Sequence, residues 1–449
     1  MTGQRWRLAE GGLIDRTRVL RFRFDGRAYQ GHPGDTLASA LLANGVRLLG
    51  RSFKYHRPRG IVAAGADEPN ALVELGSGRH LAPNTPATQI ELYDGLIASS
   101  QNRWPSLRFD LMAGNSLLAP VLPAGFYYKT FKWPAAFWEP VYERVIRRSA
   151  GLGRAARDPD PDVYEHGHAH ADVLVVGAGP AGLAAALAAG QSGARVILAD
   201  DRPHLGGTLA FERATPGTAP ADAWIADVER QLAALPEVRI FRRTSVFGYY
   251  DHNVLGALEH VADHLQPGPQ HAPRQRLWTI RARQVVLATG ALERPLVFAD
   301  NDRPGVMLAA AVRAYVSGYG VAPGRRIVVA TNNDDAYRTA LDAHAAGIEV
   351  AAIVDCRVEP GHLADRARAA AIEVRSRSVV RRARGRLEVR GVEIATVDGA
   401  ALGQLACDLV AMSGGWNPTL HLSSQSGARP VWSEALATFL PGPPRQAER

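Results

Sequence analysis

The chain has 449 residues, of which 46% are hydrophobic and 21% are charged, and its formal net charge is +8 at pH 7. This composition is an ordinary globular balance that argues against disorder, and the length predicts two or three folded domains. Because only three of the 52 basic residues are lysines and the arginines are spread among acidic residues, the positive charge does not predict a nucleic-acid partner.

Cysteine content and hydropathy restrict the cellular setting. Cys356 and Cys407 are the only cysteines, which predicts neither a disulfide framework nor a metal site. No window holds 18 uninterrupted apolar residues, and the N-terminus MTGQRWRLAEGGLIDR carries charges where a signal peptide has an apolar core. We therefore expect a cytoplasmic protein without a membrane segment.

Residues 1–100 predict a small α+β domain of the ubiquitin or ferredoxin (β-grasp) type. VLRFRFDGRAYQGH alternates around Asp25-Gly26, a dipeptide typical of a tight hairpin turn. PGDTLASALLANGV then predicts a helix that is capped by Asp35 or Thr36 and closed by Gly45. A later apolar run at residues 71–75 adds a further expected strand.

Basic and aromatic residues alternate in RSFKYHRPRG, residues 51–60. Such a pattern could serve as a stacking surface for nucleic acid. We interpret it instead as a structural or subunit-docking loop formed by Lys54, His56, Arg57 and Arg59, with a flavin or dinucleotide phosphate as a further candidate neighbour.

Residues 101–165 form an aromatic and proline-rich connecting segment. Its large apolar groups predict that it covers another domain or a partner subunit, or that it packs as an irregular layer on its own chain. RAARDPDPDVYEHGHAH, residues 154–170, predicts an exposed linker. We expect His166, His168 and His170 to hold no metal, because a flexible segment fixes no ligand geometry.

The strongest motif is ADVLVVGAGPAGLAAALAAGQSGARVILAD, residues 171–200. A buried strand runs into Gly177, Gly179 and Gly182, whose spacing suits a tight turn, close approach to a pyrophosphate, and packing of the next helix. The helix N-terminus would attract phosphates. A second strand ends in Asp200, where a carboxylate can accept hydrogen bonds from a ribose.

Later motifs extend this domain over residues 166–320. HLGGTL supplies a glycine pair after the second strand, and RQVVLATGALERP supplies another buried strand. Together they resemble flavoproteins of the pyridine nucleotide disulfide reductase type. Residues 321–405 resemble the inserted second dinucleotide domain of that group, but the turn reads TNNDD, and side chains and carboxylates there would repel a pyrophosphate. We expect this domain to bind no NADPH, with an unusual nucleotide pose as the alternative.

Several strings together resemble the alpha subunit of heterotetrameric sarcosine oxidase. They are RFRFDGRAYQGHPGDTLASALLANG, KYHRPRG, SQNRWPSL, LPAGFYYKTF, FGYYDHN, LERPLVFADNDRPGVM and SGGWNPTLHL. The resemblance covers the whole chain and implies a component of an oxidoreductase that acts on CH–NH donors, in a complex with beta, gamma and delta subunits. Such a complex oxidises sarcosine with oxygen, giving glycine, a one-carbon unit and hydrogen peroxide.

The resemblance also implies cofactors. NAD⁺ would occupy the GAGPAG site, although FAD presents the same adenosine pyrophosphate to the same glycines. FMN would lie at the boundary with the beta subunit. We expect no catalytic side chain in this chain, and the expected cofactor-binding residues are Gly177, Gly179, Pro180, Ala181, Gly182, Asp200, Asp201, Gly206, Gly207, Thr208, Val246, Ala288, Thr289, Gly290 and Arg294.

Two departures from the family pattern matter. Some relatives carry a [2Fe-2S] cluster on four thiolates in the N-terminal domain, but no cysteine precedes Cys356, so we expect no cluster. The chain also has about half the length of the family's alpha subunits. Residues 406–449 form the return segment, and in the 31 residues that follow DLVAMSGGWNP, residues 408–418, we find neither the further strand nor the glycine-rich turn that should complete the first dinucleotide domain. We therefore expect a truncated or split subunit that binds nucleotide weakly unless another chain completes it.

Three functions compete. The chain is a truncated alpha subunit of a sarcosine-oxidase-like complex, the alpha subunit of an opine or hydroxyproline dehydrogenase, or a non-catalytic scaffold for a flavoprotein partner.

Overall fold

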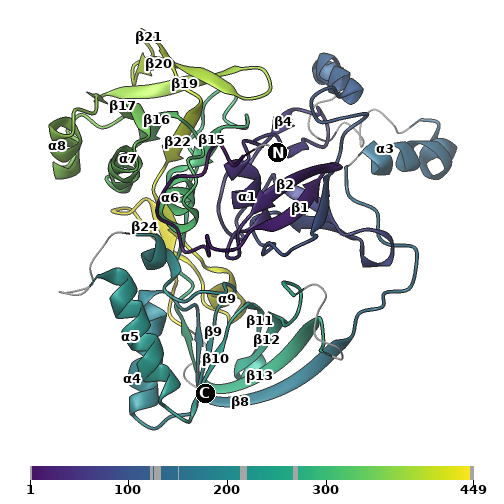
Figure 1. The fold of residues 1–449 in the computed structure, drawn as a ribbon, viewed down its shortest axis with the longest axis vertical. Coiled ribbons are helices and arrows are strands. Elements are labelled where there is room, and N and C mark those ends of the chain that lie inside the picture. The colour runs from purple at the N-terminus through teal and green to yellow at the C-terminus, as the bar shows by residue number, and fades with distance from the viewer. Residues whose placement is uncertain are drawn as a thin grey trace. The chain divides into compact units, whose positions relative to one another are not determined.

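The protein is described by a computed structural model covering residues 3–121, 125, 133–149, 151–212, 220–265 and 272–444 (Figure 1). It consists of two compact units, each built from two stretches of chain. Unit 1 comprises residues 1–161 and 295–415, and unit 2 comprises residues 162–294 and 416–449. Among the described residues, no helix is both long and apolar enough to cross a membrane.

The N-terminal part of unit 1 is a five-stranded mixed sheet in the order β2-β1-β7-β5-β6. The predicted hairpin is confirmed, since Leu20 pairs with Gly31 and Asp25 and Gly26 both have positive φ. The predicted helix is confirmed too, and the Thr36 side chain caps it. The elements are β1 (Leu20–Phe24), β2 (Arg27–Gly31), α1 (Leu37–Ala43), β3 (Gly50–Arg51), β4 (Pro58–Arg59), β5 (Leu72–Leu75), η1 (Gly78–His80), β6 (Ala82–Pro86) and β7 (Ile97–Ser100).

The connecting segment contains helical elements where it is described, and its last two residues begin β8 (Tyr164–Val176). The helical elements are η2 (Leu111–Val121), η3 (Ala135–Phe137), η4 (Trp138–Glu143) and α3 (Arg144–Ser149). Trp104, Leu117 and Trp133 are exposed over more than half of their surface. The part of the aromatic string that reads FYYKTFK lies outside the described residues.

The second part of unit 1 is a five-stranded parallel sheet in the order β15-β22-β16-β17-β18, with a three-stranded antiparallel sheet, β19-β20-β21. The predicted strand, helix and strand of the inserted domain are β16, α7 and β17. The elements are β15 (Val306–Leu308), α6 (Ala309–Tyr319), β16 (Arg326–Thr331), α7 (Asp335–Ala345), β17 (Glu349–Asp355), α8 (His362–Ala369), β18 (Val374–Arg375), β19 (Ser378–Gly385), β20 (Val389–Thr396), β21 (Ala401–Ala406) and β22 (Leu409–Ser413). β15 and α6 thus belong to this sheet and its covering layer. The predicted boundary at residue 321 had assigned them to the preceding domain.

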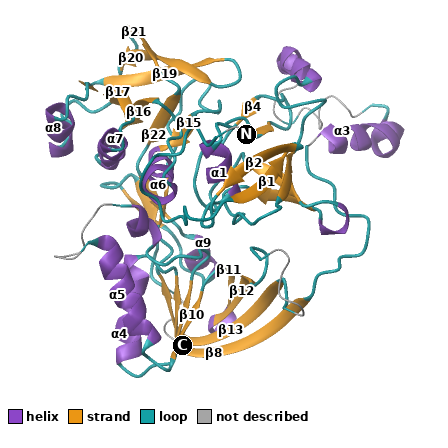
Figure 2. Ribbon diagram, in the orientation of Figure 1, coloured by secondary structure: helices purple, strands orange, loops and turns teal. Residues whose placement is uncertain are grey.

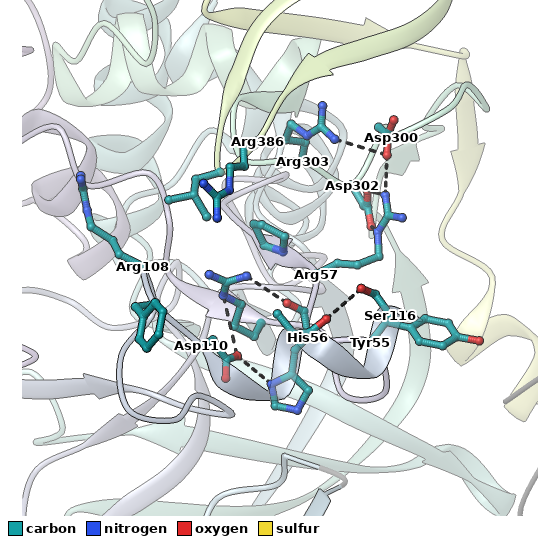
Figure 3. A pocket seen from close by; sticks show the side chains of 15 residues that line it. Tyr55, His56, Arg57, Arg108, Asp110, Ser116, Asp300, Asp302, Arg303 and Arg386 are labelled. Atoms are coloured by element: carbon teal, nitrogen blue, oxygen red, sulfur yellow. Dashed lines mark hydrogen bonds and ion pairs between the residues drawn. The ribbon is translucent and has the colours of Figure 1, made fainter. Parts of the chain in front are cut away.

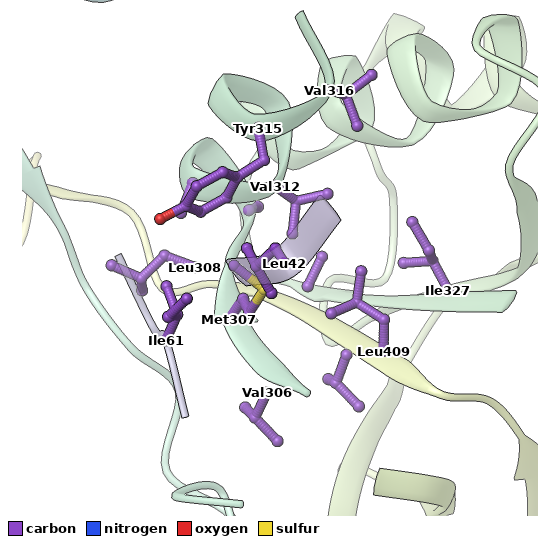
Figure 4. Close-up of a cluster of buried hydrophobic side chains, with 14 of the residues drawn as sticks. Leu42, Ile61, Val306, Met307, Leu308, Val312, Tyr315, Val316, Ile327 and Leu409 are labelled. Carbon is purple, nitrogen blue, oxygen red and sulfur yellow. The ribbon is translucent and has the colours of Figure 1, made fainter. Parts of the chain in front are cut away.

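One continuous core joins the two sheets of unit 1. Leu42 of α1 and Ile61 belong to the same buried cluster as Val312 of α6 and Leu409 of β22 (Figure 4). Backbone bonding adds to this packing, because the Leu308 N–H donates to the carbonyl of Val62 over 2.8 Å. The N-terminal sheet therefore has no separate interior.

Unit 2 is built on a six-stranded sheet in the order β10-β9-β8-β13-β12-β11 (Figure 2). The first four strands are parallel, and the last two are antiparallel additions. The elements are β8 (Tyr164–Val176), α4 (Pro180–Gln191), β9 (Val196–Ala199), η5 (Gly207–Phe211), α5 (Ala221–Ala233), β10 (Val238–Phe241), β11 (Thr244–Tyr250), η6 (Asp251–Asn253), β12 (Val254–His260), β13 (Gln275–Leu287), β14 (Ala291–Glu293), β23 (Trp416–Pro418), α9 (His421–Gln425), β24 (Val431–Ser433) and β25 (Thr438–Leu440).

Two buried clusters cover the two faces of this sheet. Val175 of β8 packs with Leu183 of α4 and Leu232 of α5. Leu174, the preceding residue, packs on the opposite face with Ile280 of β13 and with α9. Alternate side chains of one strand thus fill both layers, which explains why the strand reads as a continuous apolar run.

The linker prediction is wrong for its last seven residues. β8 begins at Tyr164, and its pairing with β13 places His166 opposite Leu277 and His170 opposite Arg281. The three histidines are exposed on one face of the strand, and no metal-binding group of three or more His, Cys, Asp or Glu side chains occurs among the described residues. The strand could not be read from the sequence, because its partner lies more than a hundred residues away.

Candidate functional site

The glycine turn between β8 and α4 is tightly built. Gly177 has a φ of +97°, and a Cβ there would overlap the Ala288 carbonyl oxygen at the end of β13. A Cβ at Gly182 would overlap the Gly177 carbonyl oxygen. Both glycines are therefore required by close packing of strand, turn and helix.

Gly179 differs from these two glycines because a Cβ there would meet nothing within 4 Å. It is the N-cap of α4, and no side chain caps it. Pro180 and Ala181 in the first turn of the helix are exposed. The uncapped N–H groups and the positive end of the helix dipole thus face an open space, as a pyrophosphate site requires.

Asp200 at the end of β9 is buried against the turn. Its Oδ2 accepts the Ala178 N–H over 2.6 Å, and its Oδ1 accepts the Arg202 N–H over 2.9 Å. Burial raises the pKa of Asp200 above its ordinary value, while these hydrogen bonds oppose the shift. The carboxylate therefore holds the turn closed, and its contact with a ribose stays a prediction. Asp201 beside it is exposed.

The loop after β9 packs onto the same turn. The Gly206 N–H donates to the Ala178 carbonyl over 2.8 Å, and a Cβ at Gly207 would lie 2.9 Å from the Gly179 Cα. Thr208 is exposed at the start of η5. The GAGPAG motif did not single out Ala178, whose N–H and carbonyl bind two different segments. The position of Ala178 inside this motif was the available signal.

The remaining predicted residues lie at three other places in unit 2. Val246 is half buried in β11, the strand whose first residue, Thr244, donates its N–H to the Asp200 carbonyl over 2.7 Å. Thr289 and Gly290 follow β13. Arg294 donates to the Ala437 carbonyl over 2.9 Å, so its guanidinium is held by the C-terminal hairpin. The glycines, Asp200 and Ala288 are thus brought together at the turn, whereas Arg294 is held elsewhere.

The return segment contains a strand, β23, which pairs with β14 and not with the six-stranded sheet. Among the described residues, no strand after residue 415 joins that sheet. Thr289 Oγ1 donates to the Thr419 carbonyl over 3.2 Å, and the Thr419 N–H donates to the Gly290 carbonyl over 3.0 Å. Residues after 415 thus fix the Thr289-Gly290 backbone.

The corresponding turn of unit 1, between β16 and α7, is filled by its own side chains. Arg357 Nη1 lies 2.7 Å from Asp334 Oδ1, and Arg357 Nη2 lies 2.8 Å from Asp355 Oδ2. Tyr337 donates its hydroxyl to Asp355 over 2.8 Å, and the pKa of Tyr337 is raised by burial and by this carboxylate. A Cβ at Gly361 would overlap the Asp334 carboxylate. An ionic network therefore occupies the end of the strands where a dinucleotide would bind.

The basic loop at residues 51–60 is anchored within unit 1. His56 is buried with its Nδ1 2.8 Å from Asp110 Oδ2. Arg57 binds Asp302 through Nε at 2.8 Å, and Arg59 binds the same carboxylate. Burial tends to raise the pKa of Asp302, but the hydrogen bonds and charges of both arginines hold it below its ordinary value. These contacts give the loop a structural role.

The loop that follows is organised around one buried carboxylate. Glu68 accepts four backbone N–H groups at 2.7 to 3.0 Å, and the donors are Val62, Ala63, Asn70 and Ala71. The side chain is buried, and burial raises the pKa of Glu68, against the effect of these donors. The only indication in the sequence was a pair of acidic residues, Asp67 and Glu68, in a largely apolar string.

Two sequence families match parts of the chain. Residues 17–103 match the family described as "2Fe-2S iron-sulfur cluster binding domain", and residues 172–237 match "FAD dependent oxidoreductase". The second match covers the glycine turn, α4, β9 and the Asp200 carboxylate, and it supports a flavin cofactor. The residues of the first match do not fit a cluster, because they contain no cysteine and their loop encloses Glu68.

Three curated relatives show the level of similarity. The sarcosine oxidase alpha subunit of Rhizobium meliloti (strain 1021) is 53% identical over 436 residues, which cover 97% of this chain and 44% of the relative. The sarcosine oxidase alpha subunit of Corynebacterium sp. (strain U-96) is 40% identical over 96% of this chain and 41% of its own length. An opine oxidase subunit of Agrobacterium tumefaciens (strain Ach5) is 31% identical over 42% of this chain and 37% of its own length. The chain spans less than half the length of these relatives.

A solved structure supports the architecture. L-proline dehydrogenase from P. horikoshii matches with a TM-score of 0.62 and 20% identity, covering 95% of this chain and 66% of that chain. At this identity the likeness concerns the fold alone. It agrees with the predicted fold class, in which two Rossmann-like domains follow a small ferredoxin-like domain.

Proposed function

We propose that this chain is a member of the family of sarcosine oxidase alpha subunits and that it acts in an oxidoreductase complex that oxidises sarcosine. The reaction with oxygen would give glycine, a one-carbon unit and hydrogen peroxide. The observation that carries the proposal is the 53% identity to a sarcosine oxidase alpha subunit across 97% of the chain. The preformed glycine turn of unit 2 supports it, because this turn suits a dinucleotide.

The chain's own contribution would be to hold a dinucleotide at the β8–α4 turn. The uncapped N–H groups of α4 would bind the pyrophosphate, while Asp200 keeps the turn closed and leaves its remaining lone pairs for a ribose. A bound flavin would supply the electron acceptor for amine oxidation. We propose NAD⁺ for this site with FAD as the alternative, and an FMN shared with a beta subunit.

We further propose that the N-terminal domain binds no iron–sulfur cluster. A [2Fe-2S] cluster needs four protein ligands, usually thiolates, and this domain has no cysteine. The backbone N–H groups of the loop converge on the Glu68 carboxylate, which thereby replaces a cluster as the anionic centre of the loop.

Beta, gamma and delta subunits are the proposed partners, and the substrate would bind outside this chain. None of the described residues forms a nucleophile or acid–base constellation at the turn. A complex in which the amine is oxidised on another subunit fits a chain whose side chains mainly hold a cofactor.

The opine match favours a second candidate, the alpha subunit of an opine or hydroxyproline dehydrogenase, although it covers only 42% of the chain. A non-catalytic scaffold is the third candidate.

Co-expression with the genes beside its own separates these three candidates. Peroxide formed from sarcosine supports the first, dye reduction that depends on an opine supports the second, and a complex without amine turnover supports the third. An absorbance spectrum of the purified complex separates flavin from NAD⁺.

A further inference from the structure

A cavity of about 350 Å³ lies in unit 1 between the basic loop, the start of the connecting segment and the β19–β20 turn (Figure 3). Its volume is within the range of sites for small organic ligands. Five arginines and three aspartates line it, so positive side chains outnumber negative ones. All of these residues belong to unit 1, whereas the β8–α4 turn belongs to unit 2.

The three aspartates are already engaged. Asp110 is buried and accepts a hydrogen bond from His56 Nδ1 over 2.8 Å. The carboxylates of Asp300 and Asp302 each accept a hydrogen bond from the Arg57 guanidinium at 2.8 Å. The Arg303 guanidinium lies 3.4 Å from the Asp300 carboxylate. All three carboxylates of the cavity are therefore already paired with other residues that line it.

Two arginines are left without a counter-charge among the described residues. Arg108 and Arg386 are exposed, and neither forms an ion pair or a side-chain hydrogen bond within that part of the chain. Figure 3 shows Arg303 and Arg386 on the side of the cavity opposite His56 and Asp110.

The buried Arg51 guanidinium adds a third positive group. It donates to the Leu107 carbonyl, and its nearest carboxylate oxygen, on Asp110, is 3.9 Å away. Burial lowers the pKa of Arg51, and the positive charge of Arg386 lowers it further, which means that the two guanidinium groups repel one another. An anion placed between them would remove this repulsion.

Aromatic side chains complete the lining. Phe109 is 64% exposed and Tyr55 lies on the same cavity. A planar ring can pack against such faces, and a space of this volume exceeds what a bare phosphate or sulfate needs.

We propose that this cavity binds an aromatic phosphate monoester, with its phosphate between Arg386, Arg108 and Arg51 and its ring against Phe109 and Tyr55. The inference does not depend on the proposed amine oxidation, since it rests on unit 1 alone.

Calorimetric titration of the full 449-residue chain with phenyl phosphate tests this site. We expect saturable binding that weakens at least fivefold between about 50 and about 300 mM salt, on the order of what screening of several charge pairs gives. Phenol, which lacks the phosphate, should bind at least tenfold more weakly. Inorganic phosphate should also bind more weakly, because it lacks the ring.

Two variants and a matched control complete the experiment. R108Q and R386Q should each weaken phenyl phosphate binding about tenfold without changing the unfolding temperature, since both side chains are exposed. R366Q removes an exposed arginine of α8 and should change nothing. No binding of phenyl phosphate, equal binding of phenol, or unchanged binding in R386Q and R108Q would overturn the proposal, and equal affinity for inorganic phosphate would overturn its aromatic part.

Discussion

The two strand-to-helix turns of this chain differ in the room that they leave for a phosphate. At the β8–α4 turn, Gly179 faces open space and the helix N-terminus has no side-chain cap. At the β16–α7 turn, the side chains of Asp334 and Arg357 fill the corresponding place. Topology alone therefore does not make a site; the residues at the end of the first strand decide whether a phosphate can approach.

The largest effect on stability is expected from G182A, at the start of α4 beside the β8–α4 turn. A Cβ at this position overlaps a backbone oxygen that cannot rotate away, so we expect a loss of about 3 to 5 kcal/mol in the free energy of unfolding of unit 2. Urea unfolding followed by circular dichroism measures this loss. A variant as stable as the wild type would show that the helix does not pack as closely on the turn as we describe.

The next largest effect concerns Glu68 in unit 1. E68A leaves four backbone N–H groups without their acceptor, two of them on the buried residues Ala63 and Ala71, and we expect a loss of about 3 kcal/mol in the free energy of unfolding. E68Q keeps one acceptor oxygen and should lose less. Thermal unfolding of both variants checks the order, and iron analysis of the wild type should find no bound iron. Wild-type stability of E68A would contradict the role given to the carboxylate.

R357A removes the arginine side chain that fills the β16–α7 turn, and it tests whether that turn then binds a nucleotide as we propose for the β8–α4 turn. Asp355, which is fully buried, would lose its cationic partner, so we expect a loss of about 2 kcal/mol in the free energy of unfolding. The variant should still bind no NADPH at this turn, because the Asp334 and Asp355 carboxylates would remain. Equilibrium dialysis with NADPH measures this, and saturable binding gained by R357A would contradict our account of the TNNDD turn.

Much of this comparison could be predicted from the sequence, because it depends on short segments. The GAGPAG turn, the capped helix α1 and the Asp25-Gly26 hairpin all follow from residues that are close together in the chain. The loss of glycines in TNNDD was equally visible, although the Arg357 network that fills the space depends on a side chain more than twenty residues later.

The parts that failed depend on distant partners. The strand character of His166 to His170 comes from pairing with β13, which lies more than a hundred residues later in the chain. The hydrogen bonds to Glu68 come from both sides of its loop, and the cavity of unit 1 collects residues from four separate stretches of sequence. No periodicity within one segment reports such contacts.

The smallest effect on stability is expected from G179A. The added methyl group meets nothing in the protein, and the backbone conformation suits any residue, so the free energy of unfolding should change by less than about 0.5 kcal/mol. The methyl would nevertheless lie where the pyrophosphate approaches, so we expect at least tenfold weaker nucleotide binding. Normal stability together with unchanged binding would contradict the site.

The most direct test of the central claim is a count of bound dinucleotide in the complex co-expressed with its partner subunits. The protein is denatured, and the NAD⁺ or FAD released is quantified per chain, for the wild type, G179A and R357A. We predict one dinucleotide per chain in the wild type and in R357A, and much less than one in G179A. A full complement in G179A would contradict a site at the first turn, and a loss in R357A alone would place the nucleotide at the second turn.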